Sequence, residues 1–195
     1  DEQEGLREEA RQREYAWLTG DVRAEDRATQ YGHRAAIVLF TGSAQTGKTF
    51  LARRVEALLV ADSRHAYLLE GENLLQGLDA DLSAADPSFA AERVRRYGEV
   101  ARLLIDTGLI VVSTSKTFGI NYQRMAEMIR TLVQPAPVIA VHMSRAGEEP
   151  PPNTDLHFAG PQDFDAAARQ ILEELKRRGV LIQPSGTKST IQYSI

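Results

Sequence analysis

One loop constrains what this chain can fold into more than any other feature. Residues 42–49 read GSAQTGKT, which matches the pattern G-x-x-x-x-G-K-[ST]. The apolar stretch AAIVLFT at 35–41 precedes it, and the amphipathic stretch FLARRVEALLVA at 50–61 follows it. A loop of this pattern works between a buried strand and a helix, so the sequence predicts a strand–loop–helix unit that binds phosphate. A glycine turn that binds nothing is the alternative, and this context disfavours it.

Each residue type in the loop has a physical role. Gly42 and Gly47 let the backbone curl so that successive N–H groups point at a phosphate. Lys48 is expected to reach the β- and γ-phosphates of ATP, and the Thr49 hydroxyl is expected to ligate Mg²⁺. The predicted nucleotide site is the whole loop: Gly42, Ser43, Ala44, Gln45, Thr46, Gly47, Lys48 and Thr49.

Apolar stretches alternate with amphipathic ones along the rest of the chain. Strands are expected at 35–41, 65–70, 109–113, 137–144 and 155–158, and helices at 50–61, 88–106, 121–133 and 163–178. A short helix is expected after the second strand. This alternation indicates βαβ units and therefore a three-layer α/β domain with a parallel five-stranded sheet. Tyr97 lies on an apolar helical stripe, His142 lies in a strand in or beside the core, and Asp163 is a candidate helix cap.

Composition limits the class of protein. The 195 residues fit one domain, for which we expect a charged helix or linker at 1–30, the α/β body at 31–180 and a polar tail at 181–195. A formal net charge of −4 argues against a general nucleic-acid binder. No apolar run approaches the roughly 20 residues that a membrane span needs. The absence of cysteine excludes disulfides and is consistent with the cytoplasm.

Three collinear blocks resemble the adenylylsulfate (APS) kinases, a family with the nucleotide-kinase type of phosphate-loop fold. GHRAAIVLFTGSAQTGKT resembles the family pattern G-H-x-x-x-x-x-W-x-T-G-L-S-G-S-G-K-S-T. YLLEGENLLQGLDADL resembles Y-x-L-D-G-D-N-x-R-x-G-L-N-x-D-L. AERVRRYGEVARLLIDTGLIVVS resembles E-N-I-R-R-x-x-E-V-A-x-L-x-x-D-A-G-x-I-x-x-x-S. The resemblance covers about 30–180 and implies transfer of the γ-phosphate of ATP to the 3′-hydroxyl of adenylylsulfate.

The resemblance assigns further site residues one by one. The two aspartates of D-G-D-N are Glu70 and Glu72 here, and Asn73 is retained. We expect Glu70, with Lys48, to be catalytic and Glu72, with Thr49, to lie at Mg²⁺. Each glutamate carboxylate sits one methylene, about 1.3 Å, further from the backbone than an aspartate, and phosphoryl transfer depends strongly on position.

The acceptor side departs further from the family pattern. The arginine of D-N-x-R is Leu75, and the long lid that the family carries after the fourth strand is missing. Expected acceptor-binding residues are Asn73, Arg93, Arg96, Lys116 and Phe118. Arg93 and Lys116 are basic where the family is not, so they recruit a different anion or are solvated surface charges.

Three hypotheses follow. The first is a working adenylylsulfate kinase that uses ATP and Mg²⁺. The second is an inactive nucleotide-binding domain that regulates or scaffolds a neighbour, and the third is a kinase with another acceptor. The partners expected from the resemblance are ATP, adenylylsulfate, a fused or associated ATP sulfurylase or GTPase-type subunit, and a second copy of the chain in a homodimer.

Overall fold

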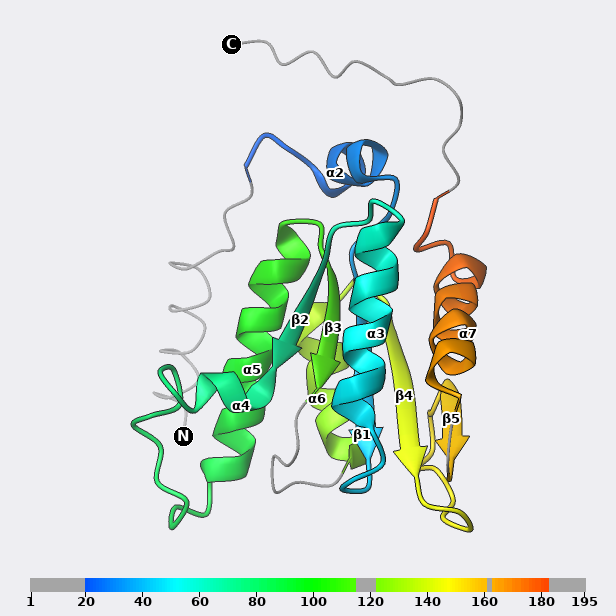
Figure 1. The fold of residues 1–195 in the computed structure, drawn as a ribbon. Coiled ribbons are helices and arrows are strands. Elements are labelled where there is room, and N and C mark those ends of the chain that lie inside the picture. Colours follow the sequence, from blue (N-terminus) through cyan, green and yellow to red (C-terminus); the bar gives the residue numbers. More distant parts are fainter. Residues whose placement is uncertain (1–19, 115–121, 161–162, 183–195) are drawn as a thin grey trace.

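A computed structural model describes residues 20–114, 122–160 and 163–182. Five parallel strands form one sheet in the order β2-β3-β1-β4-β5 (Figure 1). The strands are β1 (Ala36–Gly42), β2 (Ala66–Glu70), β3 (Ile110–Thr114), β4 (Val138–Ser144) and β5 (Leu156–Ala159). The predicted parallel five-stranded α/β fold is confirmed, and all strand ends fall within one residue of the expected ranges.

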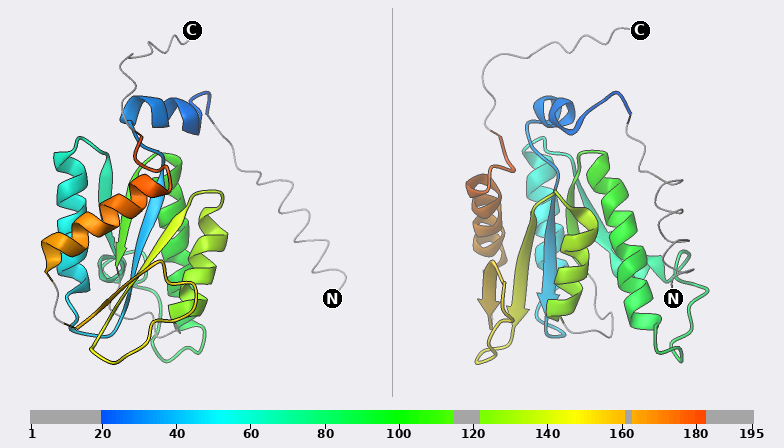
Figure 2. Two further views of the ribbon diagram at one scale, coloured as in Figure 1. Left: turned by 90° about the vertical axis from the view of Figure 1, so that its right-hand side faces the viewer. Right: turned by 180° about the vertical axis from the view of Figure 1, so that it is seen from behind.

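Helices cover both faces of the sheet and make the molecule three-layered. They are α2 (Ala24–Tyr31), α3 (Lys48–Ala61), α4 (Gly71–Leu74), α5 (Phe89–Asp106), α6 (Tyr122–Val133) and α7 (Phe164–Arg177). Helices α3 and α7 lie on one face, and α5 and α6 lie on the other (Figure 2). Helix α2 lies at the end of the sheet opposite the loop that follows β1 (Figure 1).

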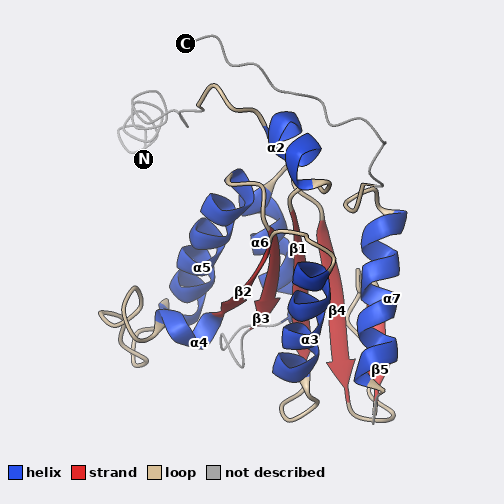
Figure 3. Ribbon diagram, turned by 45° about the horizontal axis from the view of Figure 1, so that its top comes forward, coloured by secondary structure: helices blue, strands red, loops and turns tan. Residues whose placement is uncertain are grey.

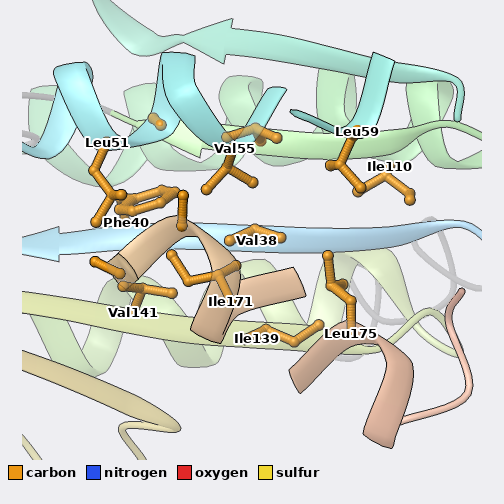
Figure 4. Packing of buried hydrophobic residues seen from close by; sticks show 14 of the residues in the cluster. Val38, Phe40, Leu51, Val55, Leu59, Ile110, Ile139, Val141, Ile171 and Leu175 are labelled. Carbon is orange, nitrogen blue, oxygen red and sulfur yellow. The ribbon is translucent and has the colours of Figure 1, made fainter. Parts of the chain in front are cut away.

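The core between the sheet and helices α3 and α7 explains why these segments are helical. One stripe of each helix is apolar, and it packs against the strand residues that point to the same face (Figure 4). The packed residues include Val38, Phe40, Ile110, Ile139 and Val141 of the strands, Leu51, Val55 and Leu59 of α3, and Ile171 and Leu175 of α7. Burying one such side chain stabilises the fold by roughly 1.5–3 kcal/mol.

The opposite face is closed by α5 and α6. Tyr97 is fully buried there, as its place on the apolar stripe of α5 predicted. The two helices approach closely at Gly98, where an added Cβ would lie 2.3 Å from Cδ1 of Leu132. β1, β3 and β4 are buried along their whole length, whereas the edge strand β2 buries only Leu69.

Segments near both ends of the described chain complete the body. The Tyr31 ring of α2 packs on His65 with centroids 4.2 Å apart, and His33 forms a β-bridge with Leu181. The Arg64 guanidinium donates to the carbonyls of Gly32 and Ile182. Helix α2 and the residues up to 182 therefore pack against the α/β body.

Several local predictions can be compared with the structure directly. The Asp163 carboxylate accepts from the N–H groups of Asp165 and Ala166, so the predicted cap of α7 is confirmed. His142 is 4% exposed within β4, also as predicted. Helix α3 begins at Lys48 rather than at residue 50. In the part of the chain that the structure describes, no helix is both long and apolar enough to cross a bilayer.

Candidate active site

The loop between β1 and α3 owes its path to two glycines. Gly42 has φ 120°, and a Cβ added there would lie 1.9 Å from the Met143 carbonyl oxygen of β4. Gly47 has φ 88°, and its Cβ would lie 2.6 Å from the ring of Phe164. Positive φ is strained for residues with a Cβ, and neither position has room for one. The sequence prediction that glycine is needed at both positions therefore has a steric cause in β4 and α7.

Hydrogen bonds hold the first half of the loop against its neighbours. The Ser43 N–H donates to Met143 O at 3.0 Å, and the Thr46 hydroxyl donates to Ser43 O at 2.9 Å. The Tyr122 hydroxyl of α6 donates to Gly42 O at 2.8 Å. These bonds join the loop to β4 and α6 and hold its curled shape.

The side chain of Lys48 folds back onto the first residues of this loop. Its side chain comes from the first residue of α3, is 7% exposed, and donates to Gly42 O at 3.0 Å and to Ser43 O. Burial lowers the pKa of the ammonium, and the negative charge of Glu72 opposes that shift. The Glu72 carboxylate is thus close enough for its charge to act on the Lys48 ammonium.

The acidic residues follow the end of β2 at the same edge of the sheet. Glu70 is the last residue of β2 and lies in register with Thr114 of β3. Glu72 lies in the four-residue helix α4, which follows β2 directly (Figure 3). The carboxyl ends of parallel strands meet at one edge, which explains how residues so distant from the loop at 42–49 reach it.

Tyr97 contacts the end of β2 next to Glu70 and Glu72, the two residues that we call the acidic corner. Its hydroxyl donates to Leu69 O at 2.8 Å and lies 2.6 Å from the Ser113 hydroxyl. Burial raises the pKa of Tyr97, and the negative charges of Glu70 and Glu72 add to that effect. The buried phenol therefore fixes the end of β2 immediately before Glu70.

The predicted acceptor residues have different surroundings. Asn73 is exposed on α4, and Leu75, in place of the arginine of the family pattern, is 38% exposed. Arg93 is only 4% exposed, and its Nε lies 3.4 Å from Oδ2 of buried Asp79. Of the two alternatives for Arg93, the solvated surface charge is wrong, because α5 turns this side chain inward toward Asp79 and Gly71, and a role in binding the acceptor stays a prediction. Lys116 and Phe118 lie outside the described residues.

Arg96 contacts carboxylates of its own chain. Its two terminal nitrogens lie 2.5 and 3.0 Å from the two carboxylate oxygens of Asp81. Its Nε donates to Glu92 at 2.9 Å, and Nη1 also donates to Leu78 O at 2.6 Å. Hydrogen bonds from Arg95 and Arg96 lower the pKa of Glu92 to about 2. These contacts anchor the segment after α4 to helix α5.

A family model described as adenylylsulphate kinase matches residues 34–150. The chain belongs to this family. It is 29% identical to an adenylyl-sulfate kinase of Yersinia pestis, over 85% of this chain and 89% of that protein. It is 38% identical to one of Shewanella amazonensis, over 66% of this chain and 63% of that protein.

Solved structures of adenylylsulphate kinases share the fold. A mutant of the Mycobacterium tuberculosis APS kinase CysC superposes with a TM-score of 0.64 and 29% identity, over 74% of this chain and 99% of that one. A hexameric APS kinase of Thiobacillus denitrificans gives a TM-score of 0.63 at 24% identity, over 78% of this chain and 31% of that one. The fold resemblance extends to a Janibacter sugar kinase, with a TM-score of 0.52 at 12% identity over 77% of this chain and 99% of that one.

Three hydrogen bonds of this family member had no signal in its sequence: those of Glu148 with Ser43, His142 with Thr41, and Tyr122 with Gly42. The Glu148 carboxylate, from the 145–155 connection between β4 and β5, accepts from the Ser43 hydroxyl at 2.5 Å. That bond and the Arg145 N–H lower the pKa of Glu148. His142 Nδ1 lies 2.9 Å from the Thr41 hydroxyl, immediately before the phosphate loop. Glu148, His142 and Tyr122 all act across large sequence separations, which no local pattern reveals.

The residues present fit a magnesium ion that arrives with a nucleotide. Mg²⁺ usually keeps several waters and binds one or two carboxylates together with substrate phosphates. Thr49 in the first turn of α3 carries a hydroxyl, and Glu72, whose charge acts on Lys48, carries a carboxylate, so both have oxygen atoms of the kind that Mg²⁺ prefers. Within 20–114, 122–160 and 163–182 no group of three or more acidic or imidazole side chains could hold a metal by itself.

Proposed function

We propose that this chain binds Mg·ATP in the 42–49 loop and transfers the γ-phosphate to the 3′-hydroxyl of adenylylsulfate. One observation carries the proposal. The Lys48 ammonium donates to the Gly42 carbonyl of the curled loop, and the charge of Glu72 acts on it. Glu72 follows closely after Glu70, the last residue of β2. A relative of the same fold, the M. tuberculosis APS kinase CysC, has been solved with AMPPNP and APS.

In this proposal each side chain has one role. The loop N–H groups and the N-terminus of α3 bind the ATP phosphates. Lys48 turns from the Gly42 and Ser43 carbonyls to the β- and γ-phosphates. Glu70 accepts the proton of the acceptor 3′-hydroxyl as that oxygen attacks the γ-phosphorus, and the oxygen bridging to ADP leaves with the bond electrons. When bound, Mg²⁺ at Thr49 and Glu72 would neutralise charge developing on the phosphates.

The acceptor is held by fewer groups in this proposal than in the family pattern. Asn73 on exposed α4, Lys116 and Phe118 remain proposed contacts. Arg96 is a weaker candidate, because Asp81 and Glu92 already engage it. The same site with another acceptor anion remains an outcome that the assay below distinguishes. The lack of cysteine supports a cytoplasmic location as part of the proposal.

A second function has its own supporting observation. Glu148, from the 145–155 connection between β4 and β5, bonds Ser43 at the start of the phosphate loop, and this is the connection in which the sequence comparison expects the family's long lid to be missing. A site without a closing lid excludes water poorly during transfer. An inactive domain that binds a nucleotide and regulates or scaffolds a fused or associated ATP sulfurylase or GTPase-type subunit is therefore the alternative.

The two functions are separated by measuring binding and turnover on one preparation. Calorimetry with AMPPNP and Mg²⁺ should show binding that Lys48→Ala weakens about tenfold or more, because a charged hydrogen-bond donor to the phosphates is lost. Lys176→Ala, which removes an exposed lysine of α7, is the matched control. An assay of ADP release with adenylylsulfate then tests transfer.

Each outcome decides between the proposals. Binding with turnover supports the kinase, and binding without turnover supports the regulatory domain. Turnover with another nucleotide or sugar acceptor but not with adenylylsulfate supports a changed acceptor. Equal affinity of Lys48→Ala and the unmodified protein would contradict nucleotide binding at this loop.

A further inference from the structure

A buried cluster centred on Arg93 lies directly beneath the acidic corner. Its guanidinium lies 3.4 Å from Oδ2 of Asp79 through Nε and 3.4 Å from the Gly71 carbonyl oxygen through Nη2. The ring of Phe89 lies 5.6 Å from the guanidinium carbon and covers it. The side chains of Arg93 and Asp79 are 5% and 0% exposed. The cluster thus joins α5, the turn after α4, and the first residue of α4.

The cost of burying this pair indicates that it serves more than stability. Two charges lose their hydration on burial, and their attraction offsets the loss only with good geometry and further hydrogen bonds. Oδ1 of Asp79 is also buried and finds no hydrogen-bond donor among the described residues. A pair of this kind adds little net stability, so its effect on the structure lies in the position of the groups that it contacts.

The position fixed is the backbone between the two acidic residues. Gly71 separates Glu70 from Glu72, and the direction of its carbonyl sets the plane of the peptide that leads into Glu72. Helix α4 spans only Gly71–Leu74, which is too short to be stable without outside contacts. A guanidinium presents a rigid fork of donors, so Arg93 contacts a carboxylate and a carbonyl together.

We propose that Asp79 and Arg93 are positioning residues that hold the Gly71 carbonyl and thereby direct the carboxylates of Glu70 and Glu72. This inference deepens the proposed function and rests on it for the role of the carboxylates.

Hydrogen exchange of the ligand-free protein tests the positioning without any nucleotide. Arg93→Lys keeps the buried charge balance but lacks the fork that reaches both acceptors. We expect the amides of residues 72–75 to exchange about tenfold faster in Arg93→Lys and in Asp79→Asn, as local opening becomes easier. Amides in α3 should keep their rates. The control is Arg95→Lys, the same change on the exposed face of α5.

Magnesium dependence of nucleotide binding tests the consequence. The half-saturating Mg²⁺ concentration for AMPPNP binding should rise about tenfold or more in both variants, since supporting contacts behind metal ligands typically contribute that much. AMPPNP affinity in EDTA should not change, because the phosphate loop and Lys48 are untouched. Arg95→Lys should match the unmodified protein in both conditions.

The outcomes keep the positioning role separate from the proposed function. Folded Arg93→Lys with unchanged exchange at 72–75 and an unchanged Mg²⁺ midpoint overturns the inference. If AMPPNP fails to bind the unmodified protein, the proposed function fails while hydrogen exchange still tests the positioning. If neither variant folds, hydrogen exchange of the unmodified protein is the test. Amides of α4 that are protected as strongly as those of α5 support the positioning role, and α4 amides that exchange freely overturn it.

Discussion

The phosphate loop and the acidic corner lie at the same edge of the sheet, but different interactions hold them in place. Between β1 and α3, the phosphate loop is shaped by glycine sterics and by bonds to backbone carbonyls, such as Ser43 N–H to Met143 O. Between β2 and α5, the acidic corner is held by side chains, namely the Tyr97 hydroxyl and the Arg93–Asp79 pair. Backbone shape tolerates changes of side chain, whereas a side-chain network changes with each member. The phosphate loop therefore depends on the two glycines Gly42 and Gly47, whereas the acidic corner depends on the side chains of Tyr97, Arg93 and Asp79.

The largest effect is expected on the phosphate-loop side, from Gly42→Ala. The added Cβ would lie 1.9 Å from a backbone oxygen of β4, and neither strand can move without breaking the sheet. We expect a loss of stability of about 3 kcal/mol or more and loss of nucleotide binding. Urea denaturation measures the first and calorimetry the second.

Gly77→Ala is the matched control for that substitution. Nothing lies within 4 Å of a Cβ at Gly77, and its φ is not positive. This variant should stay within about 1 kcal/mol of the unmodified protein. Equal stability of the two alanine variants would contradict the steric account of the loop.

An intermediate effect is expected at the acidic corner, from Tyr97→Phe. The change removes the phenol hydroxyl that hydrogen-bonds the buried oxygens Leu69 O and Ser113 Oγ. The free energy of unfolding should fall by about 1–3 kcal/mol, with weaker magnesium-dependent binding because the end of β2 loosens. Tyr67→Phe is the control, because Tyr67 lies in β2 and is 49% exposed. If both variants lose the same stability, the phenol does not anchor the corner.

The smallest effect is a pH dependence beside the phosphate loop. Burial, the His157 ring and Lys48 lower the pKa of His142, so the folded state prefers the neutral imidazole. Below about pH 6.5 the unfolded chain binds a proton that the folded chain does not, so stability falls as the pH falls and is flat above about pH 7. The slope from this one group is at most about 1.4 kcal/mol per pH unit.

His142→Asn isolates that contribution. The loss of unfolding free energy between pH 7.5 and pH 5.5 should be smaller in the variant than in the unmodified protein. His33, whose pKa burial also lowers, contributes equally to both proteins and cancels in the difference. Identical pH profiles would show that His142 does not couple the loop to pH.

Sequence periodicity was enough for the five strands and for helices α3 to α7 because their causes are local, whereas helix α2 had no periodic signal of its own. Strands and helices follow from apolar spacing, and the cap at Asp163 follows from its own carboxylate. The order of the strands in the sheet did not follow from that spacing, because it depends on which helix crosses which face. The inward turn of Arg93 was also missed, since an arginine within a charged stretch of helix looks like surface until its partner at Asp79 is located.

The sequence by itself determined the phosphate loop, its flanking strand and helix, and the membership of a kinase family. Those features depend on contiguous residues whose backbone conformation and chemistry are set over a few positions. Only the tertiary structure decided that Glu148 meets Ser43, that Tyr97 supports the end of β2, and that Arg93 supports Gly71. Such contacts join residues far apart in the chain, and their energies exist only after the sheet has brought the strand ends together.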